Sequence, residues 1–433
     1  EERGIKAGRA HKERLAAGCV GVKRTTGQHP GGIVVLPLGE MIYSFTPVQH
    51  PANDMTTKTI TTHFDYHSID HNLLKLDILG HDDPTMIRML QDLIGLDPVK
   101  DIPLDCREVM SLFQDTSALG ITPEDIGGCK LGALGIPEFG TDFAMQMLID
   151  TKPQAFSDLV RIAGLSHGTD VWLGNAQTLI QEGKATISTA ICTRDDIMTY
   201  LIGKGLDSEE AFTIMERVRK GAVANGKCKE WPEYKQDMLD HGVPDWYVWS
   251  CEKIKYMFPK AHAAAYVMMA WRIAWCKVFY PLAYYAAFFS IRATSFNYEL
   301  MCQGKERLEY FMHDYERRKD TLSKKEQDTY KDMRIVQEMY ARGFEFLPID
   351  LYKAKAHHFQ IIDNKLMPSI STIDGLGDKA ADAVVEAAKD GKFLSRDDFR
   401  QRTKVSKTVI DLMVDLGILS DLPESNQLSL FDL

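Results

Sequence analysis

The residue best suited to chemistry is an aspartate inside an otherwise apolar segment, residues 73–80. In the run Leu-Leu-Lys-Leu-Asp-Ile-Leu-Gly, Asp77 stands where a strand favours an apolar side chain. Because burial of an unpaired carboxylate is costly, Asp77 should either form an ion pair or bind a metal ion. Lys75 lies two positions away, on the same face of such a strand, so a simple ion pair is the alternative to a metal site.

A second set of possible metal ligands is the cluster His63, Asp65 and His67, followed by Asp70 and His71. Zinc hydrolases draw on histidine and carboxylate ligands of this kind. Alternate positions would place the first three side chains on one face of a strand, but the sequence offers no distant fourth ligand. A zinc-dependent hydrolase is therefore kept as an alternative function.

A glycine-rich segment before the first expected strand could approach an anion such as a phosphate. Residues 24–32 read Arg-Thr-Thr-Gly-Gln-His-Pro-Gly-Gly and combine Arg24 and His29 with glycines that permit close backbone approach. A structural glycine turn explains the same residues. This segment is therefore a candidate for DNA contact only in combination with other signals.

Two further groups of side chains suit a phosphate ligand. Lys260 and His262 stand among alanines where a long apolar helix is expected to begin, and a helix N terminus offers free N–H groups to phosphate. Arg161 and the turn that begins with Ser166 and His167 supply a cation, a hydroxyl and an imidazole. A solvated basic helix start is the alternative for the first group.

Residues 373–381, Ile-Asp-Gly-Leu-Gly-Asp-Lys-Ala-Ala, are typical of a helix-hairpin-helix motif. Gly375 and Gly377 leave backbone N–H groups free to contact a DNA phosphate without reading bases, and Lys379 adds a cation. A degenerate second half is indicated at residues 404–408. A plain turn between helices is the alternative to nucleic-acid binding.

The chain ends in a compact apolar group that follows a segment of turn residues. Gln427, Leu428, Leu430 and Phe431 provide one polar and three apolar side chains within five positions. An exposed patch of this kind favours association, and a groove that receives a few anchors is its best partner. The alternative is a tail that folds back on its own domain. The pattern Gln-Leu-x-Leu-Phe resembles the motif that tethers bacterial replication proteins to the sliding clamp.

The elements that must position these residues follow from periodicity and from turn residues. A short buried strand is expected at 33–36 and further strands at 57–63 and 73–79, with helices at 6–17 and 85–94. Residues 103–340 are predominantly helical, with clear periodic runs at 143–149, 211–220 and 245–253, a buried helix pair at 263–291 and an exposed charged helical face at 303–342. A β-hairpin at 357–367, turning at Asp363 and Asn364, precedes a compact helical unit at 371–418.

Length and composition limit the classes of protein that these motifs can serve. A chain of 433 residues should hold two to four domains, and 45% hydrophobic with 26% charged residues describes an ordinary soluble protein. The net charge of −10 argues against a uniformly basic nucleic-acid binder, although the distribution of charge matters more than its sum. Eight scattered cysteines without a Cys-x-x-Cys pair indicate a reducing cytoplasm, and no membrane-spanning run is present. The chain does not begin with methionine, so a fragment of a longer protein is expected.

Several of these segments together resemble one family. Residues 24–32, 65–83, 135–141, 164–177 and 256–266 look like the PolC-type replicative DNA polymerase III alpha subunit of low-GC Gram-positive bacteria. The resemblance runs through nearly the whole chain in the same order. A clamp motif at the extreme C terminus favours the PolC type over the related DnaE type.

The resemblance implies a fold that is mixed α/β at the start and mainly α beyond it. It implies the end of a Pol β-like palm with the end of the thumb at 1–100 and helical fingers at 101–345. A duplex-binding helix-hairpin-helix domain at 346–420 and a flexible clamp-binding tail at 421–433 complete the expected domains. Exonuclease, PHP domain and zinc-binding cysteines of the family are absent from this sequence, so it resembles the C-terminal portion.

The activity implied is the addition of dNTPs to a primer 3′-hydroxyl with two Mg²⁺ ions held by three aspartates. Asp77 matches the third aspartate, and the sequence contains no Asp-x-Asp for the other two. The chain alone should therefore polymerise little or nothing. The implied partners are primer-template DNA, dNTPs, the beta sliding clamp and other replisome subunits. A non-catalytic, clamp-tethered DNA-binding module is the alternative function.

Overall fold

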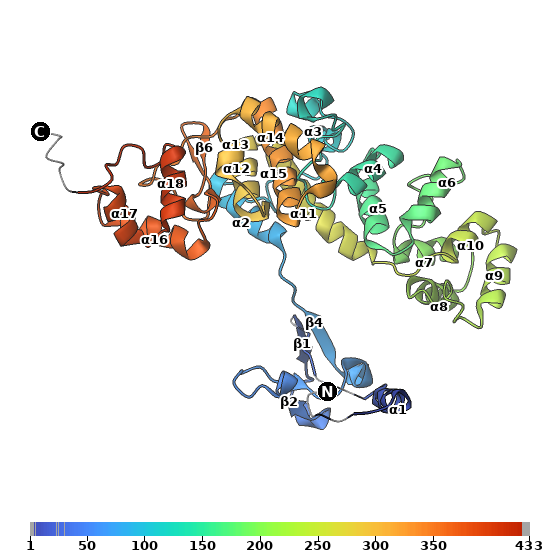
Figure 1. Ribbon diagram of the computed structural model, residues 1–433. Coiled ribbons are helices and arrows are strands. Elements are labelled where there is room, and N and C mark those ends of the chain that lie inside the picture. Colours follow the sequence, from blue (N-terminus) through green and yellow to red (C-terminus); the bar gives the residue numbers. More distant parts are fainter. Residues whose placement is uncertain (1–3, 5, 23, 25, 30, 427–433) are drawn as a thin grey trace, which may run out of the picture. The chain divides into compact units, whose positions relative to one another are not determined.

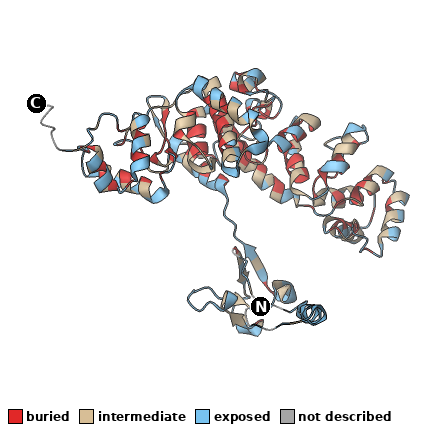
Figure 2. Ribbon diagram, viewed as in Figure 1, coloured by how far each residue is buried: buried red, intermediate tan, exposed pale blue. Residues whose placement is uncertain are grey.

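The computed structural model describes residues 4, 6–22, 24, 26–29 and 31–426 of the chain. The chain divides after His81 into two compact units, residues 1–81 and 82–433. The first unit is poor in buried side chains, whereas the second contains the extensive apolar cores (Figures 1 and 2). Among the described helices, none is both long and apolar enough to cross a lipid bilayer.

The first unit is built on two short antiparallel strand pairs. β1 (Gly32–Val35) pairs with β4 (Leu74–Asp77), and β2 (Val48–Gln49) pairs with β3 (Thr61–Thr62) (Figure 1). The strands predicted at 33–36 and 73–79 are confirmed, but only two residues of the 57–63 segment are extended. The predicted burial of the first strand is wrong, because Ile33 and Val35 are exposed. The exposed helix α1 (Arg9–Cys19) precedes them. These pairs do not by themselves amount to the palm-like sheet, which stays a prediction.

One face of the β1–β4 pair is apolar and exposed. The register places Ile33 opposite Leu76 and Val35 opposite Leu74. Because side chains alternate along a strand, these four lie on one face, and each is 38–60% exposed. The opposite face carries Lys75 and Asp77. The pair therefore separates an apolar side from the side that carries the predicted catalytic carboxylate.

The predicted strand face of histidines and aspartate is wrong. β3 ends at Thr62, and the chain turns into two 3₁₀ helices, Tyr66–Ser68 and Asp70–Asn72. The side chain of Asp65 accepts a hydrogen bond from the backbone N–H of His67 at 3.2 Å and so caps the first of them. Aspartate caps a helix start well, and this local bond competes with an extended conformation.

The second unit is helical up to residue 341. It starts with α2 (Asp82–Ile94), which confirms the helix predicted at 85–94. Its next helices are α3 (Arg107–Ser111), α4 (Asp142–Thr151), α5 (Phe156–His167), α6 (Gln177–Gln181), α7 (Arg194–Gly203), α8 (Ser208–Arg219), α9 (Trp231–Asp240) and α10 (Asp245–Cys251). The periodic runs predicted at 143–149, 211–220 and 245–253 are thus confirmed. Caps help to set the starts, because Asp207 accepts from the backbone N–H groups of Glu209 and Glu210.

The predicted buried helix pair is confirmed as α11 (Lys260–Phe279) and α12 (Pro281–Ala287). Pro281 cannot continue the first helix but suits the first turn of the second. A one-turn π-helix at Phe288–Arg292 follows, and then α13 (Tyr298–Met301), α14 (Lys305–Arg317) and α15 (Lys324–Ala341). The core of this region runs through α11, α12 and α15 (Figure 2).

The exposed charged face predicted at 303–342 is only partly correct. α14 is mostly exposed, but α15 buries Asp332 and Glu338. Glu338 forms an ion pair at 2.9 Å with Lys277 of α11, and both side chains are fully buried. The charge density of the segment gives no sign of this, because the pairing cation lies 61 residues earlier in the chain.

The C-terminal part of the second unit has its own apolar core. The predicted hairpin is confirmed as β5 (Gln360–Ile362) and β6 (Lys365–Met367), with φ of +49° and +58° at Asp363 and Asn364. Two positive φ values in a two-residue loop are the geometry that fits the twist of a hairpin. α16 (Asp378–Lys389), α17 (Arg396–Thr403) and α18 (Lys407–Asp415) form the predicted helical unit.

Candidate functional site

Asp77 lies at the end of β4 and is brought to the glycine-rich segment by strand pairing. Gly32 is its partner in the β1–β4 register, and the backbone N–H of Ile78 donates to the carbonyl of Gly31 at 2.7 Å. A Cβ atom at Gly31 would lie 2.4 Å from the carbonyl oxygen of Ile78, so only glycine permits this approach. The sequence does not reveal that these two predicted segments meet, because register depends on the pairing.

The carboxylate of Asp77 is half exposed and faces an ammonium group and an imidazole. Its Oδ1 lies 3.4 Å from Nζ of Lys75, the predicted ion pair, and 3.9 Å from Nε2 of His29. The backbone N–H of Gly31 donates to Nδ1 of His29 at 3.2 Å, which leaves Nε2, on the side of Asp77, to carry the proton. With 46% of its side chain exposed, Asp77 is paired with Lys75 but is not enclosed by it.

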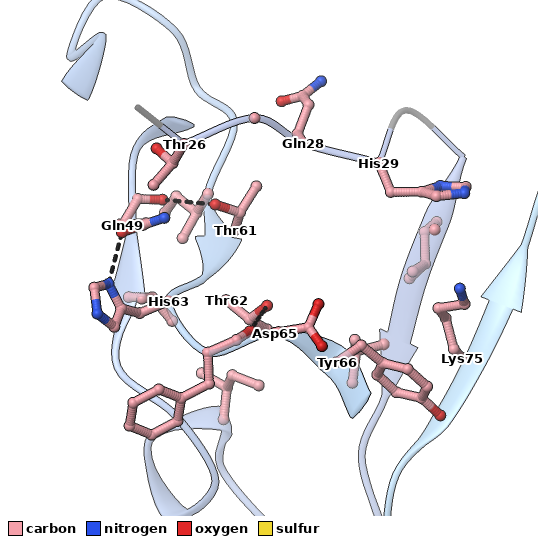
Figure 3. A pocket seen from close by; sticks show the side chains of 18 of the residues that line it. Thr26, Gln28, His29, Gln49, Thr61, Thr62, His63, Asp65, Tyr66 and Lys75 are labelled. Atoms are coloured by element: carbon pink, nitrogen blue, oxygen red, sulfur yellow. Dashed lines mark hydrogen bonds between the residues drawn. The ribbon is translucent and has the colours of Figure 1, made fainter. Parts of the chain in front are cut away.

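A cleft of about 860 Å³ opens beside this pair within the first unit (Figure 3). His29, Lys75 and Tyr66 line one side of it, and Gln49 and His63 the other. The ammonium of Lys75 lies 5.4 Å from the centre of the Tyr66 ring, whose hydroxyl donates to the carbonyl of Leu73. Lys75 is therefore held between an aromatic face and the carboxylate of Asp77.

The histidine cluster of this unit does not form a metal centre. Nδ1 of His63 lies 2.7 Å from the side-chain oxygen of Gln49 (Figure 3), and Asp65 caps a 3₁₀ helix. His67 and His71 approach Asp70 only at 4.0 and 3.8 Å on an exposed turn. Among the described residues of the 63–71 segment, no three ligand atoms converge. The geometry therefore gives no support to the zinc hydrolase alternative.

A second candidate site lies between α5 and the start of α11. The ring of His167 lies 5.6 Å from that of His262 and 5.6 Å from that of Phe258, measured between centroids. Tyr266 lies one turn beyond His262 on α11, with ring centroids 4.5 Å apart. Burial, and next the neighbouring His167, lower the pKa of His262. Gly168 permits this closeness, because its Cβ would lie 2.8 Å from the carbonyl oxygen of Tyr256.

The other predicted nucleotide-binding residues surround this aromatic group less directly. The backbone N–H of Lys260 donates to Asp195 at 2.6 Å, and Arg161 lies 4.0 Å from Asp196. Both aspartates are in the first turn of α7, so the backbone of Lys260 and the guanidinium of Arg161 face an acidic helix start. Ser166 donates its hydroxyl to the carbonyl of Ala163 within α5.

Glu138 is the residue of this site that sequence reasoning missed. Its carboxylate hydrogen-bonds Nε2 of His167, 29 positions away, and both side chains are largely buried. Neither side chain carries a periodic signal that would relate the two. Glu138 lies in the segment 135–141, which stood out only through its family resemblance.

The helix-hairpin-helix segment has the expected turn but a shorter first helix. A single 3₁₀ turn, Ile370–Thr372, precedes Gly375, whose φ is +78°. Gly377 is the N-cap of α16, and a Cβ added there would meet nothing within 4 Å. Lys379 follows in the first turn of α16. The backbone of this turn is therefore open to a close ligand at Gly377.

The second hairpin turn lies between α17 and α18. Lys404 has a φ of +60°, and the hydroxyl of Ser406 accepts from the backbone N–H of Val409 at 3.4 Å. The predicted turn at 404–408 is thus present. A groove of about 570 Å³ beside the first turn is lined by Ser295, Lys325 and Gly375, among others. Arg24, predicted to contact DNA, is exposed.

The predicted clamp-binding residues Gln427, Leu428, Leu430 and Phe431 lie outside the described residues. The described chain ends at Asn426. The segment before it is tied to α17, because the backbone N–H groups of Arg396 and Asp397 donate to the carbonyls of Pro423 and Glu424 at 2.9 and 3.1 Å.

Three family descriptions match successive parts of the chain. Residues 3–80 match the bacterial DNA polymerase III alpha NTPase domain and residues 83–242 the bacterial DNA polymerase III alpha subunit finger domain. Residues 343–428 match a helix-hairpin-helix motif. The predicted fingers and helix-hairpin-helix parts are thereby confirmed.

Curated relatives match nearly the whole chain. The chain is 53% identical over 431 residues to "DNA polymerase III PolC-type" of Caldanaerobacter subterraneus subsp. tengcongensis and, over the same length, to that of Clostridium perfringens. It is 55% identical over 425 residues to the protein of the same description from Streptococcus sanguinis. These matches cover 98–100% of this chain but only 29–30% of each relative. The chain thus spans about a third of the length of the curated relatives it matches.

Proposed function

Because this chain belongs to the PolC-type DNA polymerase III family, we propose that it serves as the C-terminal portion of a replicative DNA polymerase. In this role it takes part in the addition of dNTPs to a primer 3′-hydroxyl in the bacterial cytoplasm. The observation that carries the proposal is the ordered match of fingers and helix-hairpin-helix parts along one chain. The relatives described as PolC-type DNA polymerase III align with 98–100% of this chain.

Asp77 is proposed as one of three carboxylates that hold the catalytic metal ions. The donor chemistry fits Mg²⁺, because the carboxylate is half exposed at a strand end and offers oxygen ligands. The ions, when bound, supply charge stabilisation at the attacking and leaving oxygens. In this chain Lys75 neutralises the carboxylate at 3.4 Å, and no Asp-x-Asp supplies the other two aspartates. We therefore expect the chain alone to extend primers poorly or not at all.

The nucleotide is proposed to bind between α5 and α11. Arg161, Ser166, His167, Lys260 and His262 are the proposed contacts for its triphosphate. The closeness of the two imidazoles supports this placement. The guanidinium of Arg161 lies 4.0 Å from Asp196, so this side chain must be released, or must bridge, when an anion enters.

Duplex DNA is proposed to contact the turn at Gly375, Gly377 and Lys379, together with Arg24 and His29. The free space at Gly377 supports a backbone contact with phosphate. The residues 427–433 are proposed to bind the beta sliding clamp, and other replisome subunits are proposed to assemble around the complete polymerase. We further propose palm, fingers, duplex-binding and tail domains at 1–100, 101–345, 346–420 and 421–433.

A non-catalytic DNA-binding module tethered to the clamp is the second candidate for the chain by itself. It is favoured by the accessible helix-hairpin-helix turn at Gly377, and by the fact that the chain offers only one of the three carboxylates that the proposed metal site requires. The two candidates share the DNA and clamp contacts. They differ in whether the chain takes part in nucleotide addition.

Primer extension separates the two candidates. The chain is assayed alone, and as a chimera in which it replaces the matching segment of the Clostridium perfringens relative. We expect extension by the chimera only, and its loss on Asp77→Asn. The matched control is Glu40→Gln, because Glu40 is an exposed acid of the same unit. Extension that survives Asp77→Asn and Asp77→Ala would remove Asp77 from the proposed metal site.

A further inference from the structure

Glu138 has a backbone conformation that a residue with a side chain rarely adopts. Its φ is +69°, in the left-handed region that favours glycine. The loop around it is tight, because a Cβ at Gly140 would lie 2.6–2.8 Å from backbone atoms of Gly135 and Ile136. Such a conformation persists only where the surrounding structure holds it, and it is common at functional sites.

The loop is held from behind by a buried ammonium group. Lys277 donates to the carbonyls of Gly132 and Leu134 at 2.7 and 2.6 Å, and it pairs with the buried Glu338. The backbone N–H of Gly140 closes the loop by donating to the carbonyl of Ile136 at 2.8 Å. Backbone contacts of Gly132, Leu134, Ile136 and Gly140 therefore hold the loop that carries Glu138.

The carboxylate of Glu138 fixes one nitrogen of a proposed nucleotide-binding side chain. It accepts a hydrogen bond from Nε2 of His167, whose ring lies against those of Phe258, His262 and Tyr266. Within the described part of the chain, no group hydrogen-bonds Nδ1 of His167. With Nε2 held by an acceptor and the ring packed on its edges, the other nitrogen is left for a ligand.

We propose that Glu138 is a positioning residue of the nucleotide site, which holds the imidazole of His167 so that Nδ1 meets the triphosphate of the incoming nucleotide. The inference rests on the proposed function, because it takes His167 as a triphosphate contact. It extends that function to a residue that acts through another. The strained backbone conformation of Glu138 brings its carboxylate from the loop to Nε2 of the His167 imidazole.

The decisive variant is Glu138→Gly, because glycine adopts a φ of +69° without strain and removes the carboxylate. Glu138→Gln is the conservative variant, since its amide oxygen can still accept from Nε2. Glu124→Gln, at an exposed acid in the same unit, is the matched control. Binding of Mg²⁺–dATP to the 433-residue chain is measured by calorimetry for these variants, for His167→Ala and for the double variant.

We expect Glu138→Gly and His167→Ala each to weaken dATP binding about tenfold, since each loses a charge-assisted contact. The double variant should bind no more weakly than His167→Ala, because the carboxylate acts through the imidazole. Glu138→Gln should stay within about threefold of the unaltered chain. ¹⁵N NMR should find His167 protonated at Nε2 in the unaltered chain and as exchanging tautomers in Glu138→Gly.

Other outcomes would contradict either the positioning role of Glu138 or the proposed nucleotide site. If His167→Ala weakens binding but Glu138→Gly does not, the positioning role is wrong and the nucleotide site stands. Effects that multiply in the double variant also contradict action through His167. If the unaltered chain and His167→Ala both fail to bind dATP, the proposed site fails, and the inference with it.

Discussion

Replacement of Lys277 by methionine tests the account of how the fold holds its central loop. Lys277 is fully buried and joins Glu338 on α15 to the carbonyls of Gly132 and Leu134. Methionine fills a similar volume but leaves the carboxylate of Glu338 with the hydroxyl of Tyr285 and without its cation. Breaking one partner of a buried ion pair costs about 3–5 kcal/mol of the free energy of unfolding.

The expected change in melting temperature follows from this loss of free energy and from the entropy of unfolding, which scales with the number of residues in the unit. The second unit spans 352 residues, from 82 to 433. At about 2.1 cal/mol/K per residue, its entropy of unfolding is roughly 0.7 kcal/mol/K if it melts as one transition. A loss of about 3–5 kcal/mol therefore lowers the melting temperature by about 4–7 °C. Circular dichroism at the helical minimum measures this shift directly.

The matched control is Lys325→Met, at a lysine that pairs with Asp374 on the surface at 2.9 Å. An exposed pair contributes about 0–1 kcal/mol, so this variant should melt within about 1 °C of the unaltered chain. Equal melting temperatures for the two variants would refute the role assigned to the buried pair. A change in the melting temperature of Lys277→Met that is smaller than the error of repeated measurements would also refute it.

Three further perturbations test other parts of the molecule. Burial raises the pKa of Asp332 from 3.8 to about 7. The carboxyl group therefore loses its proton at a lower pH in the unfolded chain than in the folded chain. As a result, the free energy of unfolding should fall by about 4 kcal/mol as the pH rises from about 4 to about 7. In urea titrations Asp332→Asn should lack this component. Gly377→Ala should leave stability unchanged, because its Cβ meets nothing within 4 Å, yet weaken duplex binding several-fold, whereas Gly375→Ala, at φ +78°, should cost about 1 kcal/mol. Deletion of residues 427–433 should abolish clamp binding in surface plasmon resonance and leave duplex affinity intact.

The outcomes that contradict these expectations are equally specific. Parallel pH profiles for the unaltered chain and Asp332→Asn would remove the carboxyl from the pH dependence. Duplex affinity that is unchanged in Gly377→Ala, or changed for certain base sequences only, would contradict a backbone contact with phosphate. Clamp affinity that survives the deletion would overturn the assignment of the tail.

Local patterns predicted the elements well where one segment carries its own signal. The hairpin at Asp363 and Asn364 was predictable because these residue types tolerate a positive φ. The pair α11 and α12 follows from an apolar run broken by Pro281. The strand at 57–63 shrank to Thr61 and Thr62, because β-branched residues favour extension only where a partner strand continues.

The arrangement of the candidate sites depends on contacts that no local pattern encodes. Lys277 lies inside the apolar run of the predicted helix pair, and no local pattern shows that its ammonium anchors the loop around Glu138 through two carbonyls. The acidic residues of α15 looked exposed for the same reason, since their partners are remote in sequence. His29 and Asp77 were each chosen separately, and only the register of Gly32 with Asp77 brings them together.

The outward apolar face of the β1–β4 pair has a practical consequence for anyone who prepares the first unit separately. Ile33, Val35, Leu74 and Leu76 offer water four aliphatic side chains on a ribbon of only two strands. An isolated two-stranded sheet is only marginally stable in water, and an exposed apolar strand favours aggregation. Residues 1–81 should therefore aggregate when they are expressed without the second unit, and a charged substitution such as Leu76→Lys should reduce this aggregation.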